Sequence, residues 1–147
     1  MNSSTESART LATEILRQAA WAPGLVLAVY LLAARVLHLF NAYPDLDIPM
    51  HFAGGLGAAY FFLRSLQIAS RYELLGKPNR LAHLLLAFSL TCVAAVAWEF
   101  AEYASDRLLG THEQLGLDDT MGDLLLGILG SIVLLWLHPG TRRDPRA

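Results

Sequence analysis

Four long apolar runs constrain the fold of this chain more than any other feature. They lie at about 22–40, 49–69, 81–104 and 119–137, and each approaches the roughly 20 residues that a helix needs to cross a bilayer. Charged residues make up 16% of the chain, against about 25% in an average soluble domain. We therefore predict an all-α fold: a polytopic membrane helix bundle with four transmembrane helices, forming a single membrane domain over residues 1–147.

The two ends of the chain are more polar. Residues 1–20 place Leu11 and Ile15 on one helical face and charged side chains elsewhere, which predicts a short amphipathic helix lying on the membrane surface. Residues 139–147 form a basic tail. Nine of the eleven Lys and Arg residues fall in these end segments or in and beside the loop at 71–80. Because basic residues concentrate on the cytoplasmic side, both termini are predicted to be cytoplasmic.

The composition also bears on partners. Cys92 is the single cysteine, so neither an intrachain disulfide nor a zinc site of several thiolates can form. No basic aromatic patch is present, and we expect no nucleic-acid partner. The expected partner is the lipid bilayer. Small residues at 54, 55 and 58 and at 127 and 130 predict close helix packing, either within the chain or with a second copy or another membrane protein.

Carboxylates gather at the helix ends on the side opposite the basic segments, where nine of the thirteen acidic residues lie. Three helix ends each carry two polar side chains at helical spacing, so that each pair shares one face. Ionisable residues in apolar helices are costly and mark functional sites by default. The pairs are Asp47 and His51, Glu99 and Glu102, and Asp119 and Asp123.

Five carboxylates at close range cannot all stay ionised without a compensating positive charge. Carboxylates with one imidazole suit a divalent ion such as Zn, Fe or Mn, and carboxylates alone suit Mg. The sequence therefore predicts a divalent metal site formed by the six residues, with Arg35 near the end of the first run as a counter-ion. A metal there would polarise a substrate oxygen or activate water, for example on a lipid-linked substrate.

Two alternatives fit the same residues. The carboxylates could form a proton or cation site in a binding or transport module, without turnover. The chain could also be an accessory membrane subunit in which Asp47 and Asp119 only cap their helices. Glu99 and Glu102 do not fit the capping explanation, because a helix carboxyl terminus disfavours negative charge. The residues leave open whether the protein is an enzyme.

Three blocks resemble the signatures of the YjdF-like family of bacterial inner-membrane proteins. The resemblance covers roughly residues 40–135, and a looser similarity links the chain to VanZ-like proteins, which also place acidic blocks at helix ends. It implies an integral protein of the bacterial inner membrane and no particular activity. The blocks are Tyr43-Pro44-x-x-Asp47-x-x-x-His51-Phe52, Trp98-Glu99-x-x-Glu102 and Asp119-Thr120-x-x-Asp123.

Overall fold

The apolar runs form helices, as their length and composition predict. The computed structural model describes residues 3–76 and 78–138, and every regular element in these ranges is helical. The predicted basic tail at 139–147 lies outside the described residues. The elements are α1 (Ser3–Gln18), α2 (Trp21–Leu31), the π-helical turn η1 (Leu32–Val36), α3 (Leu39–Ala42), the 3-10 turn η2 (Pro44–Leu46), α4 (Asp47–Arg71), α5 (Arg80–Leu109) and α6 (Leu117–Leu137).

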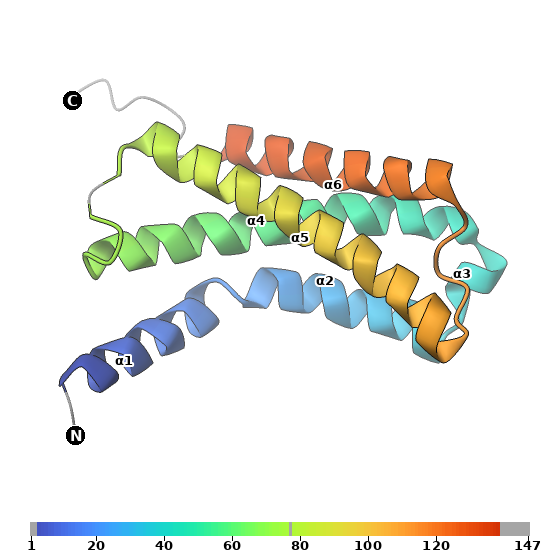
Figure 1. Cartoon of the computed structure of the whole chain (residues 1–147), viewed down its shortest axis with the longest axis horizontal. Helices are drawn as coiled ribbons and strands as arrows, with labels where there is room; N and C mark the ends of the chain where they lie inside the picture. The colour runs from blue at the N-terminus through green and yellow to red at the C-terminus, as the bar shows by residue number, and fades with distance from the viewer. Residues whose placement is uncertain (1–2, 77, 139–147) are drawn as a thin grey trace.

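Helix α4 is the centre of the bundle. It packs against α6, α5 and α2, and these four long elements run roughly alongside one another (Figure 1). The start of α4, the end of α5 and the start of α6 meet at one end of the bundle, so the acidic helix ends come together there. The opposite end holds the start of α5 and the end of α6.

Only part of the predicted membrane topology follows from the helices themselves. Helices α5 and α6 are long and apolar enough to cross a membrane. A third candidate is a broken span in which Ala8–Gln18 and Trp21–Val36 meet at 54°. Helix α4 has 25 residues but is not a candidate span by hydropathy. Its glycines, His51 and Arg64 lower its apolar content. The prediction that the apolar runs are helical is confirmed, whereas the prediction that all four cross a membrane is confirmed only in part.

The predicted range of the first helix, 22–40, extends past the point where the helix ends in the structure. The π-helical turn η1 ends at Val36, and His38 adopts a left-handed conformation with φ of 50°. A left-handed residue cannot continue a right-handed helix. Neither Gly nor Pro marks this position, so local sequence signals do not reveal the break.

Helix α5 is longer than its predicted range of 81–104. The side chain of Asn79 accepts a hydrogen bond from the backbone N–H of Ala82 and starts the helix. Gly110, with φ of 68°, ends it in the left-handed conformation that glycine tolerates. Because the helix runs to Leu109, Glu99 and Glu102 lie about three and two turns inside its end rather than at its terminus.

Glycines allow α4 and α6 to touch backbone to backbone. A Cβ atom on Gly55 would overlap the carbonyl oxygen of Gly127, and one on Gly130 would overlap that of Phe52. The close helix packing predicted from the small residues therefore occurs within the chain for these three glycines. Gly54 differs, because a Cβ atom there would have nothing within 4 Å.

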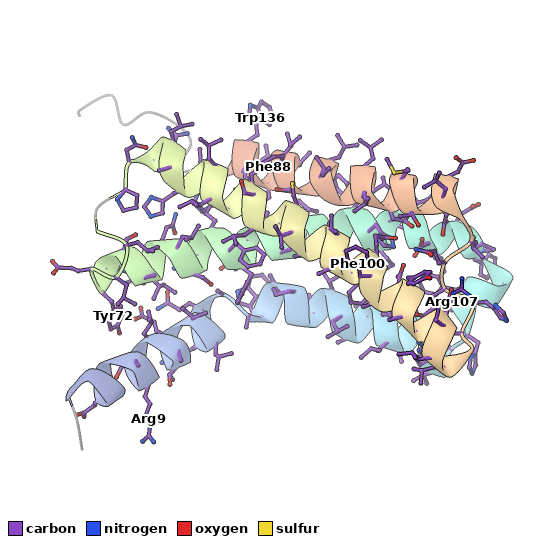
Figure 2. All side chains as sticks on the ribbon, viewed as in Figure 1. Arg9, Tyr72, Phe88, Phe100, Arg107 and Trp136 are labelled. Atoms are coloured by element: carbon purple, nitrogen blue, oxygen red, sulfur yellow. The ribbon has the colours of Figure 1, made fainter. Side chains whose placement is uncertain are left out.

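Large apolar side chains cover the outside of the bundle. Trp136 and Phe100 are 75% and 69% exposed, and both project outward (Figure 2). The buried core is small and lies around Ala59, Leu63 and Ala87, toward the end opposite the acidic residues. An apolar exterior over a small core is the arrangement expected of a protein surrounded by lipid.

Helix α1 is predicted to lie on the membrane surface, and in the structure it also docks against the end of α4. The Glu14 carboxylate accepts hydrogen bonds from Arg71, at 2.9 Å, and from the Tyr72 hydroxyl, at 3.0 Å. Arg64 donates to the Gln18 side chain at 2.9 Å. These bonds hold α1 in place while leaving Leu16 exposed.

Candidate functional site

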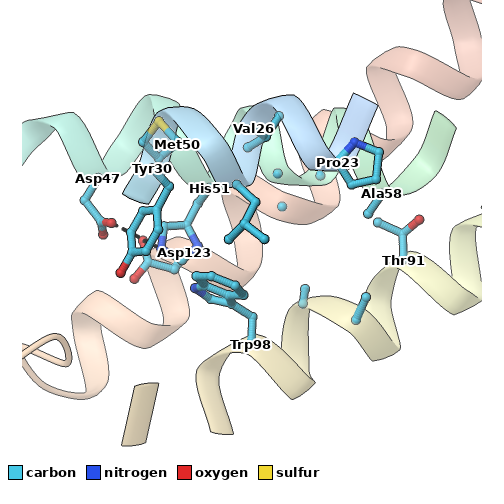
Figure 3. Close-up of a pocket in the computed structure, with 16 residues that line it drawn as sticks. Pro23, Val26, Tyr30, Asp47, Met50, His51, Ala58, Thr91, Trp98 and Asp123 are labelled. Carbon is cyan, nitrogen blue, oxygen red and sulfur yellow. Dashed lines mark ion pairs between the residues drawn. The ribbon is translucent and has the colours of Figure 1, made fainter. Parts of the chain in front are cut away.

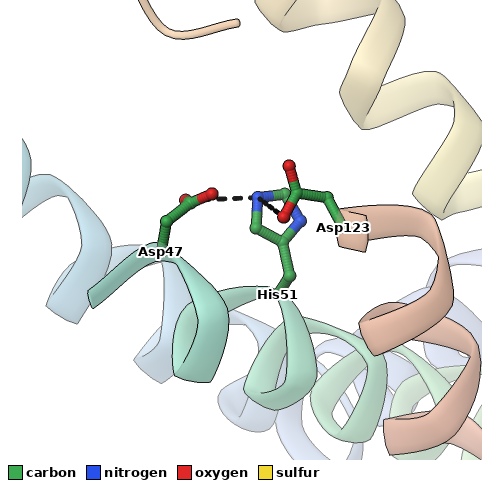
Figure 4. Close-up of side chains that lie close together, drawn as sticks. All are labelled: Asp47, His51 and Asp123. Carbon is green, nitrogen blue, oxygen red and sulfur yellow. Dashed lines mark ion pairs between the residues drawn. The ribbon is translucent and has the colours of Figure 1, made fainter. Parts of the chain in front are cut away.

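His51 stands at the centre of the acidic cluster, in the first turns of α4. Its Nε2 atom lies 3.3 Å from Oδ1 of Asp47 and 3.7 Å from Oδ1 of Asp123 (Figure 4). Its Nδ1 atom lies 3.9 Å from Oε1 of Glu99. The imidazole therefore faces carboxylates on both ring nitrogens, contributed by α4, α5 and α6.

Two groups of potential metal ligands share this imidazole. Asp47, His51 and Asp123 offer ligand atoms that all lie within 4.8 Å of one another, and the same holds for His51, Glu99 and Glu102. The structure thus brings together five of the six predicted site residues. Among the described residues, Asp47, Glu99 and Asp123 form their ion pairs only with His51, and Glu102 forms none. One imidazole therefore faces four carboxyl groups, which cannot all be ionised without a further positive charge.

Glu99 and Glu102 are buried but differ in their partners. Glu102 is 7% exposed and accepts a hydrogen bond of 2.7 Å from the indole Nε1 of Trp98, one turn earlier on α5. Glu99 is 6% exposed, and its Oε2 atom has no hydrogen-bond partner, although the Thr120 hydroxyl lies near this carboxylate. Because a buried carboxylate oxygen is costly without a partner, Glu99 points to a ligand or proton at this position.

Asp119 has a different position from the one predicted. Its Oδ2 atom accepts a hydrogen bond of 2.9 Å from the backbone N–H of Leu115, just before α6 begins. It belongs to neither of the two potential ligand groups. Asp119 lies in the first turn of α6 and ties the preceding loop to it, whereas the N-cap is Gly116 and has no side-chain capping bond, so Asp119 is not the helix cap considered from the sequence.

Arg35, the predicted counter-ion, forms its ion pair with Glu113 in the loop between α5 and α6. The same loop is held by Asp106, which accepts hydrogen bonds from the backbone N–H groups of Glu113 and Gln114. The Arg35 side chain is 52% exposed and the Glu113 side chain 19%. Arg35 thus fastens η1 to this loop, and its ion pair is not with any of the five clustered residues.

A cavity of about 260 Å³ opens beneath the cluster, between α2, α4, α5 and α6 (Figure 3). The acidic end is formed by Asp47, His51 and Asp123, and the rest of the lining is mainly apolar. Tyr30 and Trp98 also line it, with ring centroids 5.4 Å apart in an edge-to-face contact. The sequence does not reveal that these two rings meet, because one aromatic residue in an apolar run carries no signal of its neighbours.

Comparison with known proteins agrees with the apolar character of the chain. A family model described as "Predicted membrane protein (DUF2238)" matches residues 16–144. A protein of Thermotoga maritima, described as uncharacterized, is 39% identical over 87 residues. That match covers 57% of this chain and 42% of the relative, so the chain spans under half of the relative's length. No solved structure matches the chain.

Proposed function

Because the chain belongs to the DUF2238 family of predicted membrane proteins, we propose that it is a polytopic protein of the bacterial inner membrane that binds a divalent metal ion. The ligands would be Asp47, His51 and Asp123, at the outer ends of the helices. The resemblance of the site blocks to YjdF-like proteins agrees with this family, and neither implies a particular activity.

In this proposal α4 also crosses the membrane, in addition to the three candidate spans described above. Its 25 residues extend about 37 Å, enough for the roughly 30 Å of bilayer hydrocarbon. It lies between α2, α5 and α6, so its glycines and His51 face protein rather than lipid. A shielded helix can carry polar residues that a lipid-facing helix cannot. The excess of basic residues then favours cytoplasmic termini, which reporter fusions at each end would test.

The geometry around His51 is the observation that carries the metal proposal. Ligands bound tetrahedrally to a metal at about 2.0–2.2 Å are about 3.4 Å from one another. The Nε2 atom lies 3.3 Å from Asp47 and 3.7 Å from Asp123, close to that spacing. Nδ1 faces Glu99 at 3.9 Å, which is longer than a hydrogen bond, so Glu99 would move closer to orient the imidazole as carboxylates do in metal sites.

Of the two groups of potential ligands, the one at Nε2, with Asp47 and Asp123, is the better metal site. A neutral imidazole has one free nitrogen lone pair, so only one group can use His51 as a ligand at a time. The Asp47 side chain is 27% exposed and offers a path from solvent, whereas the side chain of Glu99 is 8% exposed. Glu99 would then accept the Nδ1 proton, and Trp98 would hold Glu102 through its indole N–H. A metal with three protein ligands has a position left for water or a substrate oxygen.

A proton site is the second candidate, and the same imidazole supports it. A protonated His51 would place one N–H toward Asp47 and Asp123 and the other toward Glu99. This arrangement fits a proton-binding step in a transport or binding module. It differs from the metal site in requiring no stoichiometric ion.

Elemental analysis of the purified protein separates the two candidates. The metal site predicts about one divalent ion per chain, its loss in Asp123→Asn, and its retention in Asp118→Asn, an exposed carboxylate on the same helix. Glu99→Gln should weaken metal binding by about 10–100-fold, as expected for a group that orients a ligand. A wild-type protein that binds no Zn, Mn, Fe or Mg by titration calorimetry would rule out the metal site.

A further inference from the structure

The cavity beneath the acidic cluster has the proportions of one hydrocarbon chain. Its lining on α4 runs from Asp47 to Ala58, which is about 16 Å along the helix axis. Spread over this length, its volume of about 260 Å³ leaves a mean cross-section of about 16 Å², so the space is long and narrow.

The polarity of the cavity changes along its length. Beyond the acidic end, the lining includes Pro23, Val26, Gly54, Ala58 and Ala94. The hydroxyl of Thr91, which also lines the cavity, donates to the carbonyl of Ala87 in its own helix, at 2.8 Å. Apolar cavities stay dry. Within a membrane, the hydrocarbon of lipid is the material available to fill one.

The neighbouring helices leave a path from the lipid. Helices α2 and α5 each pack against α4 or α6, but they are not closely packed against each other. Their ring contact is between Tyr30 and Trp98, near the acidic end of the cavity (Figure 3). Away from that pair the two helices make few contacts, and this is where a hydrocarbon chain would enter from the bilayer.

We propose that the cavity holds one hydrocarbon chain of a membrane lipid whose phosphate head lies at Asp47, His51 and Asp123. The position of the hydrocarbon chain is argued from the cavity alone. The position of the phosphate head rests on the proposed function, because carboxylates repel a phosphate unless a metal ion lies between them. The ligand class is therefore a phosphate-bearing lipid, bound with its head toward the outer ends of α4 and α6.

Two glycines form a matched pair of variants. Gly54 and Gly24 both have open space where a Cβ atom would be, but only Gly54 lines the cavity. Gly54→Leu fills the cavity, while Gly24→Leu adds the same side chain to an exposed face of α2. Ala94→Leu fills the cavity from α5 and serves as a second test should Gly54→Leu fail to fold.

Quenching of Trp98 fluorescence reports the binding of a hydrocarbon chain, because Trp98 lines the cavity. In full-length protein carrying Trp21→Phe and Trp136→Phe, Trp98 is the single tryptophan. The probes are dodecyl phosphate and dodecanol, each brominated near the polar end, added to the protein in detergent with and without Zn²⁺. We expect saturable quenching by both, and stronger binding of the phosphate when Zn²⁺ is present.

Each buried methylene contributes about fourfold to affinity, so a leucine that displaces two or more should weaken binding by at least about tenfold. That loss is expected in Gly54→Leu and Ala94→Leu and not in Gly24→Leu, with equal Zn²⁺ affinity in all three. Quenching that does not saturate, or that is equal in all variants, overturns the proposal. If the wild type binds no metal but dodecanol still quenches saturably, the metal site is rejected and the binding of a hydrocarbon chain in the cavity is supported. Phosphate binding that does not depend on Zn²⁺ overturns the proposed position of the head.

Discussion

The backbone of Gly55 in α4 lies directly against the carbonyl group of Gly127 in α6, one turn below His51. This contact sets how closely the two helices approach. It therefore also sets the distance between His51 and Asp123, which lie on these helices just above it. The acidic cluster depends on a contact that contains no acidic residue.

Gly55→Ala should loosen the site without changing a ligand. The added Cβ would collide with backbone that has little freedom to move, and overpacking of this kind costs about 1–3 kcal/mol. Gly54→Ala is the control, because nothing lies within 4 Å of its Cβ position. Thermal unfolding in detergent and metal titration should show losses in the first variant alone, and equal behaviour of the two would contradict this role of Gly55.

Arg35→Gln should affect the loop rather than the metal site. Arg35 pairs with Glu113, and a half-exposed pair of this kind contributes about 0.2–1 kcal/mol. We expect Arg35→Gln and Glu113→Gln to have similar small effects on stability, and the double variant to cost little more than either alone. A double-mutant cycle by denaturant unfolding measures this coupling. Metal affinity reduced tenfold or more by Arg35→Gln would instead restore its role as a counter-ion of the cluster.

Trp98→Phe should destabilise the protein through Glu102. The substitution keeps an aromatic ring but removes the N–H that Glu102 accepts at 2.7 Å. A buried acceptor left without its donor costs about 1–3 kcal/mol. In a Glu102→Gln background the same change should cost less, since an uncharged amide has a smaller desolvation penalty. An equal cost in both backgrounds, measured by thermal unfolding, would assign the effect to packing against Tyr30.

Tyr72→Phe should weaken the docking of α1 in a pH-dependent way. The hydrogen bond to Glu14 raises the pKa of the Tyr72 hydroxyl above its usual value of 10.0. A raised pKa in the docked state means that the contribution is fully present below about pH 10 and is lost as the pH rises through the docked-state pKa. Amide exchange or limited proteolysis of α1 should differ between wild type and Tyr72→Phe at neutral pH. The difference should disappear at strongly alkaline pH, and a constant difference would exclude the hydroxyl as its cause.

Most of the helices, and the faces of the acidic pairs, can be predicted from the sequence alone. Apolar runs of this length have few alternatives to helix in a membrane, because each backbone N–H and C=O must be satisfied within its own segment. Spacings of three and four residues then place Glu99 with Glu102, and Asp47 with His51, on common faces. These properties are local, and the structure agrees with them.

The residues that meet across helices cannot be predicted in the same way, because they depend on the tertiary structure. Asp119 turns to the backbone before α6 while Asp123 reaches His51, although the sequence makes both equally good candidates. Arg35 meets Glu113 because η1 and the break at His38 redirect the end of the first run. The periodicity of a helix specifies a face but not the neighbour that the face meets. That neighbour depends on helix crossings, and here backbone contacts such as Gly55 with Gly127 determine them.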